Sequence, residues 1–277
     1  MMNWNHPILL ISKKEIMDNI RNKWIIALSV IFAILALIVS YFGSYGQGWQ
    51  SLVNTILGMM GLVQFLVPII GLMLGYAAIV GEIEKGSLSA LLSFPVQRYE
   101  IVLGKFIGLS CVLAIALTAG FGIGGIIIAL TTSGENFGSY LVFLGATILM
   151  GMVFIGIALL FSALLKRRST SMGMAIFLWF FFTMIYGMIT AGIAFIIVGF
   201  EKIMTDGFPS WYYTISAVNP LSAYSLLVSM DLGITSGQDI PIQYPSFFSV
   251  GFLTVVLLIW IGVTLFLTIR IFKNREI

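Results

Sequence analysis

The chain has 277 residues, of which 60% are hydrophobic and only 9% are charged. A soluble domain carries about a quarter of its residues charged, so this composition excludes a soluble protein and indicates an integral membrane protein. The net charge of +3 and the pI near 9.0 give no reason to expect nucleic-acid binding, and the single cysteine, Cys111, excludes a disulfide framework within the chain.

Six apolar stretches are long enough, or nearly so, to cross a bilayer as helices, since a spanning helix needs about 20 residues. Strands of a membrane barrel would alternate apolar and polar residues over about ten positions, whereas these stretches are continuously apolar. The sequence therefore predicts an all-α integral membrane fold, with one transmembrane domain over residues 1–277. The predicted spans are 24–42, 54–80, 103–131, 141–165, 171–199 and 247–269.

Residues 8–22, before the first span, combine isoleucines with basic side chains and are expected to form an amphipathic helix against membrane lipid. The alternative is that the same charges contact a cytoplasmic partner. A cleavable signal peptide is not expected, because more than twenty residues with many charges precede the first apolar run. The charged residues of the helix are Lys13, Lys14, Glu15, Asp18 and Arg21.

The basic residues predict the orientation of the six spans. If the N-terminus is cytoplasmic and the spans alternate, all fourteen basic residues except Lys202 fall on the cytoplasmic side. This bias is the one that sets topology, so we expect a multi-pass protein of the cytoplasmic (inner) membrane with both termini inside. The cluster 166–168 is interpreted as a topology anchor rather than a binding site.

The segment 81–100, between the second and third spans, is a charged loop on the expected cytoplasmic side. Ser87 can cap a short helix after Gly86, and Pro95 ends it because proline has no amide hydrogen to donate. Three leucines at helical spacing would form an apolar face that suits a groove on a soluble partner. The alternative is a helix lying on lipid. The leucines are Leu88, Leu91 and Leu92, and the charges around them are Glu82, Glu84, Arg98 and Lys105.

Residues 200–246 form the longest loop on the outer side, and part of this loop is too apolar to be free in water. Since unpaired backbone does not survive in lipid, we expect interfacial or re-entrant helices, packed on the bundle before the sixth span. Pro209 and Pro220 would break them. Whether this loop is a plain connector or an outer gate stays open.

The spans lack the chemistry of an autonomous pump or enzyme. None has an Asp, Glu or His in its middle, where ion-driven transporters keep such groups. The only Gly-Lys pair, Gly104-Lys105, is followed by Phe106, so no phosphate-binding loop is present in the sequence. We therefore predict no catalytic residue, no metal ligand and no cofactor on this chain, which is expected not to be an enzyme. Its energy must come from another polypeptide.

Glycines and methionines recur in the spans. The pairs Gly71/Gly75, Gly104/Gly108 and Gly120/Gly124 permit close helix approach, which we expect within the chain rather than at a dimer seam. The fourteen methionines are interpreted as packing residues rather than a Cu(I) path.

The loop resembles that of a known family. Its pattern is Glu84-x-Gly86-Ser87-Leu88-x-x-Leu91-Leu92-Ser93-x-Pro95-x-x-Arg98, followed by Gly104-Lys105. It is similar to the cytoplasmic loop of type-2 ABC transporter permeases of the exporter class. The resemblance implies a coupling helix in a cleft of an ABC ATPase subunit, ATP and Mg on that subunit, and a second copy of this chain. The positions implied to couple are Glu82, Glu84, Gly86, Ser87, Leu88, Leu91, Leu92, Pro95, Arg98 and Lys105.

Within that family, residues 65–108 and the outer-loop motif Asn219-Pro220-x-x-x-Tyr224 resemble the NosY branch. That branch is encoded with multicopper-enzyme maturation systems, notably for nitrous oxide reductase, where a periplasmic β-helical protein is a further partner. Ala77 departs from the pattern, which leads us to expect an acidic residue there. Two alternatives stay open: a drug or lipid exporter permease unrelated to copper, and a carrier or channel without an ATPase.

Overall fold

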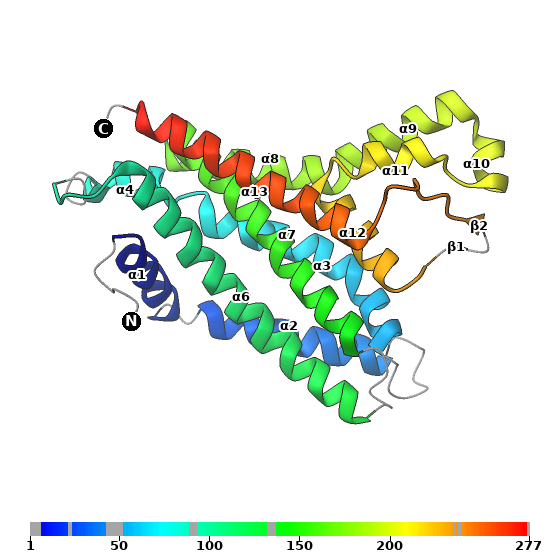
Figure 1. Ribbon diagram of the computed structural model, residues 1–277. Coiled ribbons are helices and arrows are strands. Elements are labelled where there is room, and N and C mark those ends of the chain that lie inside the picture. Colours follow the sequence, from blue (N-terminus) through cyan, green and yellow to red (C-terminus); the bar gives the residue numbers. More distant parts are fainter. Residues whose placement is uncertain are drawn as a thin grey trace.

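The computed structural model describes residues 7–21, 24–42, 52–88, 93–131, 137–234, 236–237 and 240–275, and its elements are mostly long helices (Figure 1). The first half of the chain contains α1 (Pro7–Arg21), α2 (Trp24–Phe42), α3 (Leu52–Gly75), α4 (Val80–Glu84), α6 (Arg98–Thr131) and α7 (Phe137–Leu164). The second half contains α8 (Arg168–Phe180), η1 (Phe181–Ile185), α9 (Tyr186–Val198), α10 (Phe200–Asp206), α11 (Ser210–Ser216), α12 (Pro220–Asp231), β1 (Ser236–Gly237), β2 (Ile240–Pro241) and α13 (Val250–Lys273).

The helices match the predicted spans. Among the described residues, five stretches are long and apolar enough to cross a membrane: 53–84, 98–127, 137–164, 168–198 and 250–273. The remaining predicted span is α2, which has 19 residues and follows α1. The two helices are bent by 69° from one another, and there are six crossings if this pair is one span. The prediction of an all-α membrane fold is confirmed.

The glycine pairs allow close contacts between helices. A Cβ on Gly71 would lie 2.9 Å from the carbonyl oxygen of Gly151, and one on Gly120 would lie 2.7 Å from that of Ser29. These contacts join α3 to α7 and α2 to α6, while Gly104 faces Ile11 of α1. The prediction that the pairs pack within the chain is confirmed, because only a residue without a side chain lets the backbones approach so closely.

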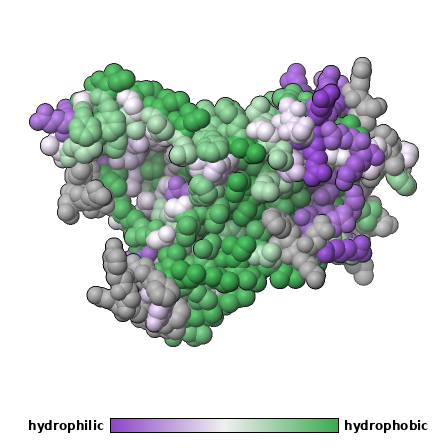
Figure 2. All heavy atoms as spheres, turned by 180° about the vertical axis from the view of Figure 1, so that it is seen from behind, coloured by the Kyte–Doolittle hydropathy of each residue, from purple (hydrophilic) through white to green (hydrophobic). Residues whose placement is uncertain are grey.

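Most of the charged residues gather at one end of the bundle. Figure 1 places α1, α4 and the last turns of α13 together at its left end, opposite α10 and the short β1–β2 ladder. In Figure 2, which views the molecule from behind, hydrophilic side chains collect at the corresponding end, and a hydrophobic belt covers the middle. We call the end that carries α1, α4 and the end of α13 the basic end. It is the end expected to face the cytoplasm.

The predicted outer loop contains the short helices α10, α11 and α12 before α13. The motif Asn219-Pro220-x-x-x-Tyr224 attaches α12 to the bundle. Asn219 caps α12 by accepting from the amide of Leu221 (3.0 Å), and its Nδ2 donates to the carbonyl oxygen of Phe182 in the π-helical turn η1 (2.8 Å). Pro220 occupies the first turn of α12, and buried Tyr224 lies with its hydroxyl 3.3 Å from that of Thr147 on α7. These three motif residues therefore have structural roles in this chain.

Candidate functional site

The second predicted span, 54–80, is broken near its end. Helix α3 ends at Gly75, and after a turn over residues 76–79 the short helix α4 begins at Val80. The turn leaves backbone amides without helical acceptors, and the hydroxyl oxygen of Ser162, on α7, accepts from the amides of Ile79 (3.0 Å) and Val80 (3.1 Å). After this turn, α4 carries Glu82 to the basic end, where it meets Lys14 of α1 and Lys105 of α6.

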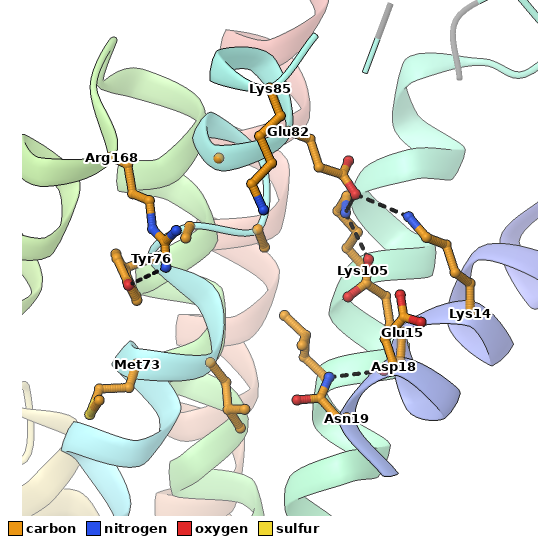
Figure 3. A pocket seen from close by; sticks show the side chains of 15 residues that line it. Lys14, Glu15, Asp18, Asn19, Met73, Tyr76, Glu82, Lys85, Lys105 and Arg168 are labelled. Carbon is orange, nitrogen blue, oxygen red and sulfur yellow. Dashed lines mark hydrogen bonds and ion pairs between the residues drawn. The ribbon is translucent and has the colours of Figure 1, made fainter. Parts of the chain in front are cut away.

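A network of four charged side chains joins α4 to α1 and α6 (Figure 3). The Nζ of Lys105 lies 2.7 Å from Oε1 of Glu15 on α1 and 2.8 Å from Oε1 of Glu82 on α4. Lys14, one residue before Glu15, places its Nζ 3.2 Å from the same oxygen of Glu82. We call these four residues the ionic network.

Lys105 is the buried centre of this network, with 2% of its side chain exposed. It was expected on the rim of a docking surface, and that prediction is wrong. Lys105 lies about two turns inside α6, where the start of the helix is covered by α1, so its charge is removed from water. A buried ammonium group is stable only when anionic partners surround it, and Glu15 and Glu82 supply them.

Lys14 stands at the outer edge of the network and stays charged at neutral pH. Burial lowers the pKa of Lys14, but the carboxylates of Glu82, Glu15 and Asp18 outweigh that effect and raise the pKa above 10.5. A raised pKa means that the charged lysine stabilises the fold at all lower pH values and loses this role only as the pH rises through the raised pKa. Lys14 therefore carries its charge across the physiological range.

Helix α1 is attached to α6 by backbone contacts as well as charges. The hydroxyl of Ser12 lies 2.9 Å from the carbonyl oxygen of Gly104. A Cβ on Gly108 would lie 2.7 Å from the Cβ of Glu15. The segment 8–22 was expected to lie on lipid. In the structure the face that carries Ile11 and Ser12 is buried against α6, because the glycines leave room for it.

Arg98, at the first position of α6, binds the end of the last helix. Its Nη1 donates to the carbonyl oxygens of Phe272 (2.7 Å) and Arg275 (2.6 Å), and its guanidinium lies 5.6 Å from the ring centre of Phe272. The last carbonyls of a helix have no partner within the helix and carry partial negative charge, so a guanidinium satisfies both needs. Arg275 in turn donates to the carbonyl oxygens of Ala163 and Leu165 at the end of α7.

Glu84 connects the loop to α8. Its Oε1 accepts from the backbone amide of Arg168 (2.8 Å), at the positive N-terminal end of α8. The guanidinium of Arg168 donates to the hydroxyl of Tyr76 (3.0 Å), and the hydroxyl of Ser171 donates to the Tyr76 carbonyl oxygen (2.6 Å). The cluster at 166–168, interpreted as a topology anchor, therefore also touches the loop through Arg168.

The tip of the loop departs from the expected apolar face. Leu88 is fully buried in the core of its own chain, so it is not an exposed anchor. Gly86 has a φ of +70°, which suits glycine, and the Ser87 hydroxyl donates to the Glu82 carbonyl oxygen at 3.3 Å. Pro95 is exposed. Leu91 and Leu92 lie outside the described residues.

The sequence did not reveal the roles of three residues of this region. Phe94 is 64% exposed on the loop, and the signal was an aromatic side chain beside Pro95 in a charged segment. Glu15 could have been found from the need of Lys105 for a carboxylate, since it follows Ile8 and Ile11 on the apolar side of its helix. Arg275 carried no local signal, because its partners are carbonyl groups at the end of α7.

The described residues contain no group of three or more His, Cys, Asp or Glu side chains placed to hold a metal ion. The chemistry of the basic end is that of ion pairs and helix caps. It joins α1, α4, α6, α8 and α13 around one loop, an arrangement suited to passing a displacement from the loop into the bundle.

The chain is similar over its whole length to known membrane proteins. A family model described as ABC-2 family transporter protein matches residues 9–277. A probable ABC transporter permease protein NosY of Stutzerimonas stutzeri is 33% identical over 287 residues, which cover 98% of both chains. A probable ABC transporter permease protein NosY of Pseudomonas aeruginosa is 33% identical over 275 residues, which cover 96% of this chain and 98% of the relative.

Proposed function

This chain belongs to the ABC-2 family of transporter permeases, and on that premise we propose that residues 85–97 pass the force of ATP hydrolysis from an ATPase subunit into the membrane helices. As an ABC permease it is a non-catalytic, multi-pass subunit of the inner membrane that works with a separate ATPase. The single observation that carries the proposal is the fastening of both ends of this loop to several helices at the basic end.

These contacts connect the loop mechanically to the helices of the bundle. On its N-terminal side, Glu82 is bound to Lys105 of α6 and Lys14 of α1, and Glu84 to the start of α8. On its C-terminal side, Arg98 is bound to the end of α13. A push on the loop would therefore tilt α6 and displace the helices attached to it. In this proposal Gly86 and Ser87 shape the loop and Pro95 ends its helix.

The contact with the ATPase is proposed to centre on Phe94, the exposed apolar side chain of the loop. Aromatic side chains that enter a pocket of a partner are frequent binding hot spots. Leu91 and Leu92, which follow Leu88 in the predicted helix, are proposed as secondary contacts with the ATPase.

Co-purification with the ATPase encoded for this permease tests the contact. Phe94→Glu should lower the affinity at least thirtyfold, the loss expected for a hot spot of about 2 kcal/mol or more. Phe200→Glu is the matched control, because Phe200 is equally exposed on α10, at the opposite end. Equal recovery of the ATPase with both variants would refute docking through Phe94.

Leu91→Glu and Leu92→Glu separate a secondary contact from a purely internal role. We expect both variants to weaken ATPase binding without lowering the melting temperature of the permease. A lowered melting temperature with normal ATPase binding would assign the two leucines to the core instead.

We also propose a finer role, carried by similarity alone: the permease drives export or moves a periplasmic partner during maturation of a copper enzyme, as two copies of the chain. The support is the similarity to two permeases named NosY and the resemblance of the outer-loop motif. The test is expression of this chain with its ATPase in a bacterium that lacks its own NosY. Copper-loaded nitrous oxide reductase should reappear. Its absence, while the permease–ATPase complex is present, would contradict the copper role and leave the ABC permease role standing.

A further inference from the structure

A cavity of about 570 Å³ opens at the basic end beside the ionic network, between α1, the α3–α4 turn, α6 and the start of α8. Its lining combines charged and apolar side chains. The charged residues are Lys14, Lys85, Lys105, Arg168, Glu15, Asp18 and Glu82, and the apolar ones include Met73, Leu74 and Leu109.

The charges of the cavity are arranged on two walls. The ionic network is neutral in itself, with two cations and two anions. Beyond it, Lys85 and Arg168 stand on the wall of α4 and α8, and Asp18 stands across the cavity on α1 (Figure 3). Figure 3 shows the side chain of Lys85 pointing into the space between Arg168 and Lys105. One wall thus attracts a phosphate and the other an ammonium group.

The Glu82 carboxylate borders the cavity and is incompletely paired among the described residues. Its Oε1 binds Lys14 and Lys105, whereas its Oε2 is buried and receives no hydrogen bond. Because Oε2 is closed off from solvent, a ligand in the cavity meets the charge of this carboxylate without bonding to that atom. The charge favours an ammonium group nearby.

The floor of the cavity is apolar and lies at the membrane boundary. Met73 and Leu74 come from the last turn of the apolar helix α3, and the first charged residue after them along the chain is Glu82. Met73 is 53% exposed, so the floor continues onto the outer surface of α3. The cavity therefore offers charged partners above and hydrocarbon contacts below, at the depth where lipid headgroups lie.

We propose that this cavity binds the headgroup of an aminophospholipid of the adjoining leaflet. The phosphate lies between Lys85 and Arg168, the ammonium group faces Asp18 near the Glu82 carboxylate, and the first acyl carbons lie on Met73 and Leu74. A soluble phosphate ester would use the charges but leave the apolar floor uncovered. The lipid would bridge α1, α4 and α8, and its binding requires no ATPase.

Native mass spectrometry of the delipidated full-length chain, titrated with defined phospholipids, tests the proposal. We expect one tightly bound phosphatidylethanolamine, and weaker binding of phosphatidylcholine, whose headgroup has no N–H to donate, and of phosphatidylglycerol. Lys85→Gln and Arg168→Gln should each weaken the binding of phosphatidylethanolamine roughly fivefold, as expected for the loss of one cation near a lipid headgroup. Lys273→Gln is the control, a basic residue at the same end that does not line this cavity.

Two further experiments identify the ligand. Asp18→Asn should reduce the preference for phosphatidylethanolamine over phosphatidylglycerol while leaving phosphatidylglycerol binding unchanged. Glycerophosphoethanolamine, the headgroup without acyl chains, should compete poorly. The proposal is overturned if the Lys85 and Arg168 variants bind as the control does, if the three lipids bind equally, or if the soluble headgroup binds as tightly as the lipid.

Discussion

At the scale of single residues, Lys105 shows why the basic end holds together. Its ammonium group is buried and is shared by carboxylates from two other helices, α1 and α4. Because neither carboxylate is well exposed either, the three groups depend on one another. A buried charge of this kind fixes which helices meet, since any other arrangement would leave it unpaired.

Replacing this lysine tests that dependence. Lys105→Met should lower the free energy of unfolding by about 3–5 kcal/mol, because Glu15 and Glu82 would remain buried without their cation. Lys14→Met is the matched control. Lys14 carries the same charge in the same network but is 56% exposed, so its loss should cost under about 1 kcal/mol. Denaturant titration in mixed micelles measures the free energy of unfolding of both variants. Similar small losses would show that burial does not determine how much an ion pair contributes to stability.

The sequence revealed the charges of this region but not their surroundings. Lys105 and Leu88 were both expected at a docking surface, and both are buried. Local spacing could identify a charged loop between two spans. It could not show that α1 folds back over the start of α6, because that contact joins residues about 90 positions apart and depends on the absence of side chains at Gly104 and Gly108.

At the scale of elements, α1 is packed closely against α6 at the basic end. The glycines of α6 let α1 approach until a Cβ on Gly108 would meet the carbonyl oxygen of Ser12 at 2.9 Å. The same approach brings Glu15 to Lys105. Packing and charge therefore act together, and moving α1 would open the ionic network.

A single methyl group tests this coupling. Gly108→Ala should push α1 away from α6, since the new Cβ meets backbone that cannot rotate aside, and overpacking of this kind costs about 1–3 kcal/mol. Hydrogen exchange of the α1 amides should become faster. Gly122→Ala lies on the same helix with no atom within 4 Å of the new Cβ, and it should leave α1 unchanged. Unaltered exchange in the Gly108 variant would contradict the close packing of α1.

The elements themselves were the most predictable part of the molecule. Continuous apolar runs located the spans, and the glycine pairs indicated close helix packing. The break of the second span was not predicted, because the two amides that it frees are satisfied by the hydroxyl of Ser162, a residue far away in the sequence. Similarly, the role of Asn219 depends on the carbonyl group of Phe182, exposed by the π-helical turn.

At the scale of the whole molecule, the chain is a membrane bundle whose loop at the basic end is bound to helices on both sides. The apolar belt leaves the bundle with no charged group in the middle of its spans, so the basic end is where a soluble motor could act on it. We predict that residues 85–97 contact the ATPase and that the helices attached to this loop move with it.

The most direct measurement is the mobility of a spin label at position 94, in a Phe94→Cys variant that also carries Cys111→Ser to remove the native cysteine. Addition of the ATPase subunit should immobilise this label, while a label on Thr205→Cys, at the opposite end, should keep its mobility. A label at position 94 that stays as mobile in the assembled complex as in the free permease would contradict docking through this loop.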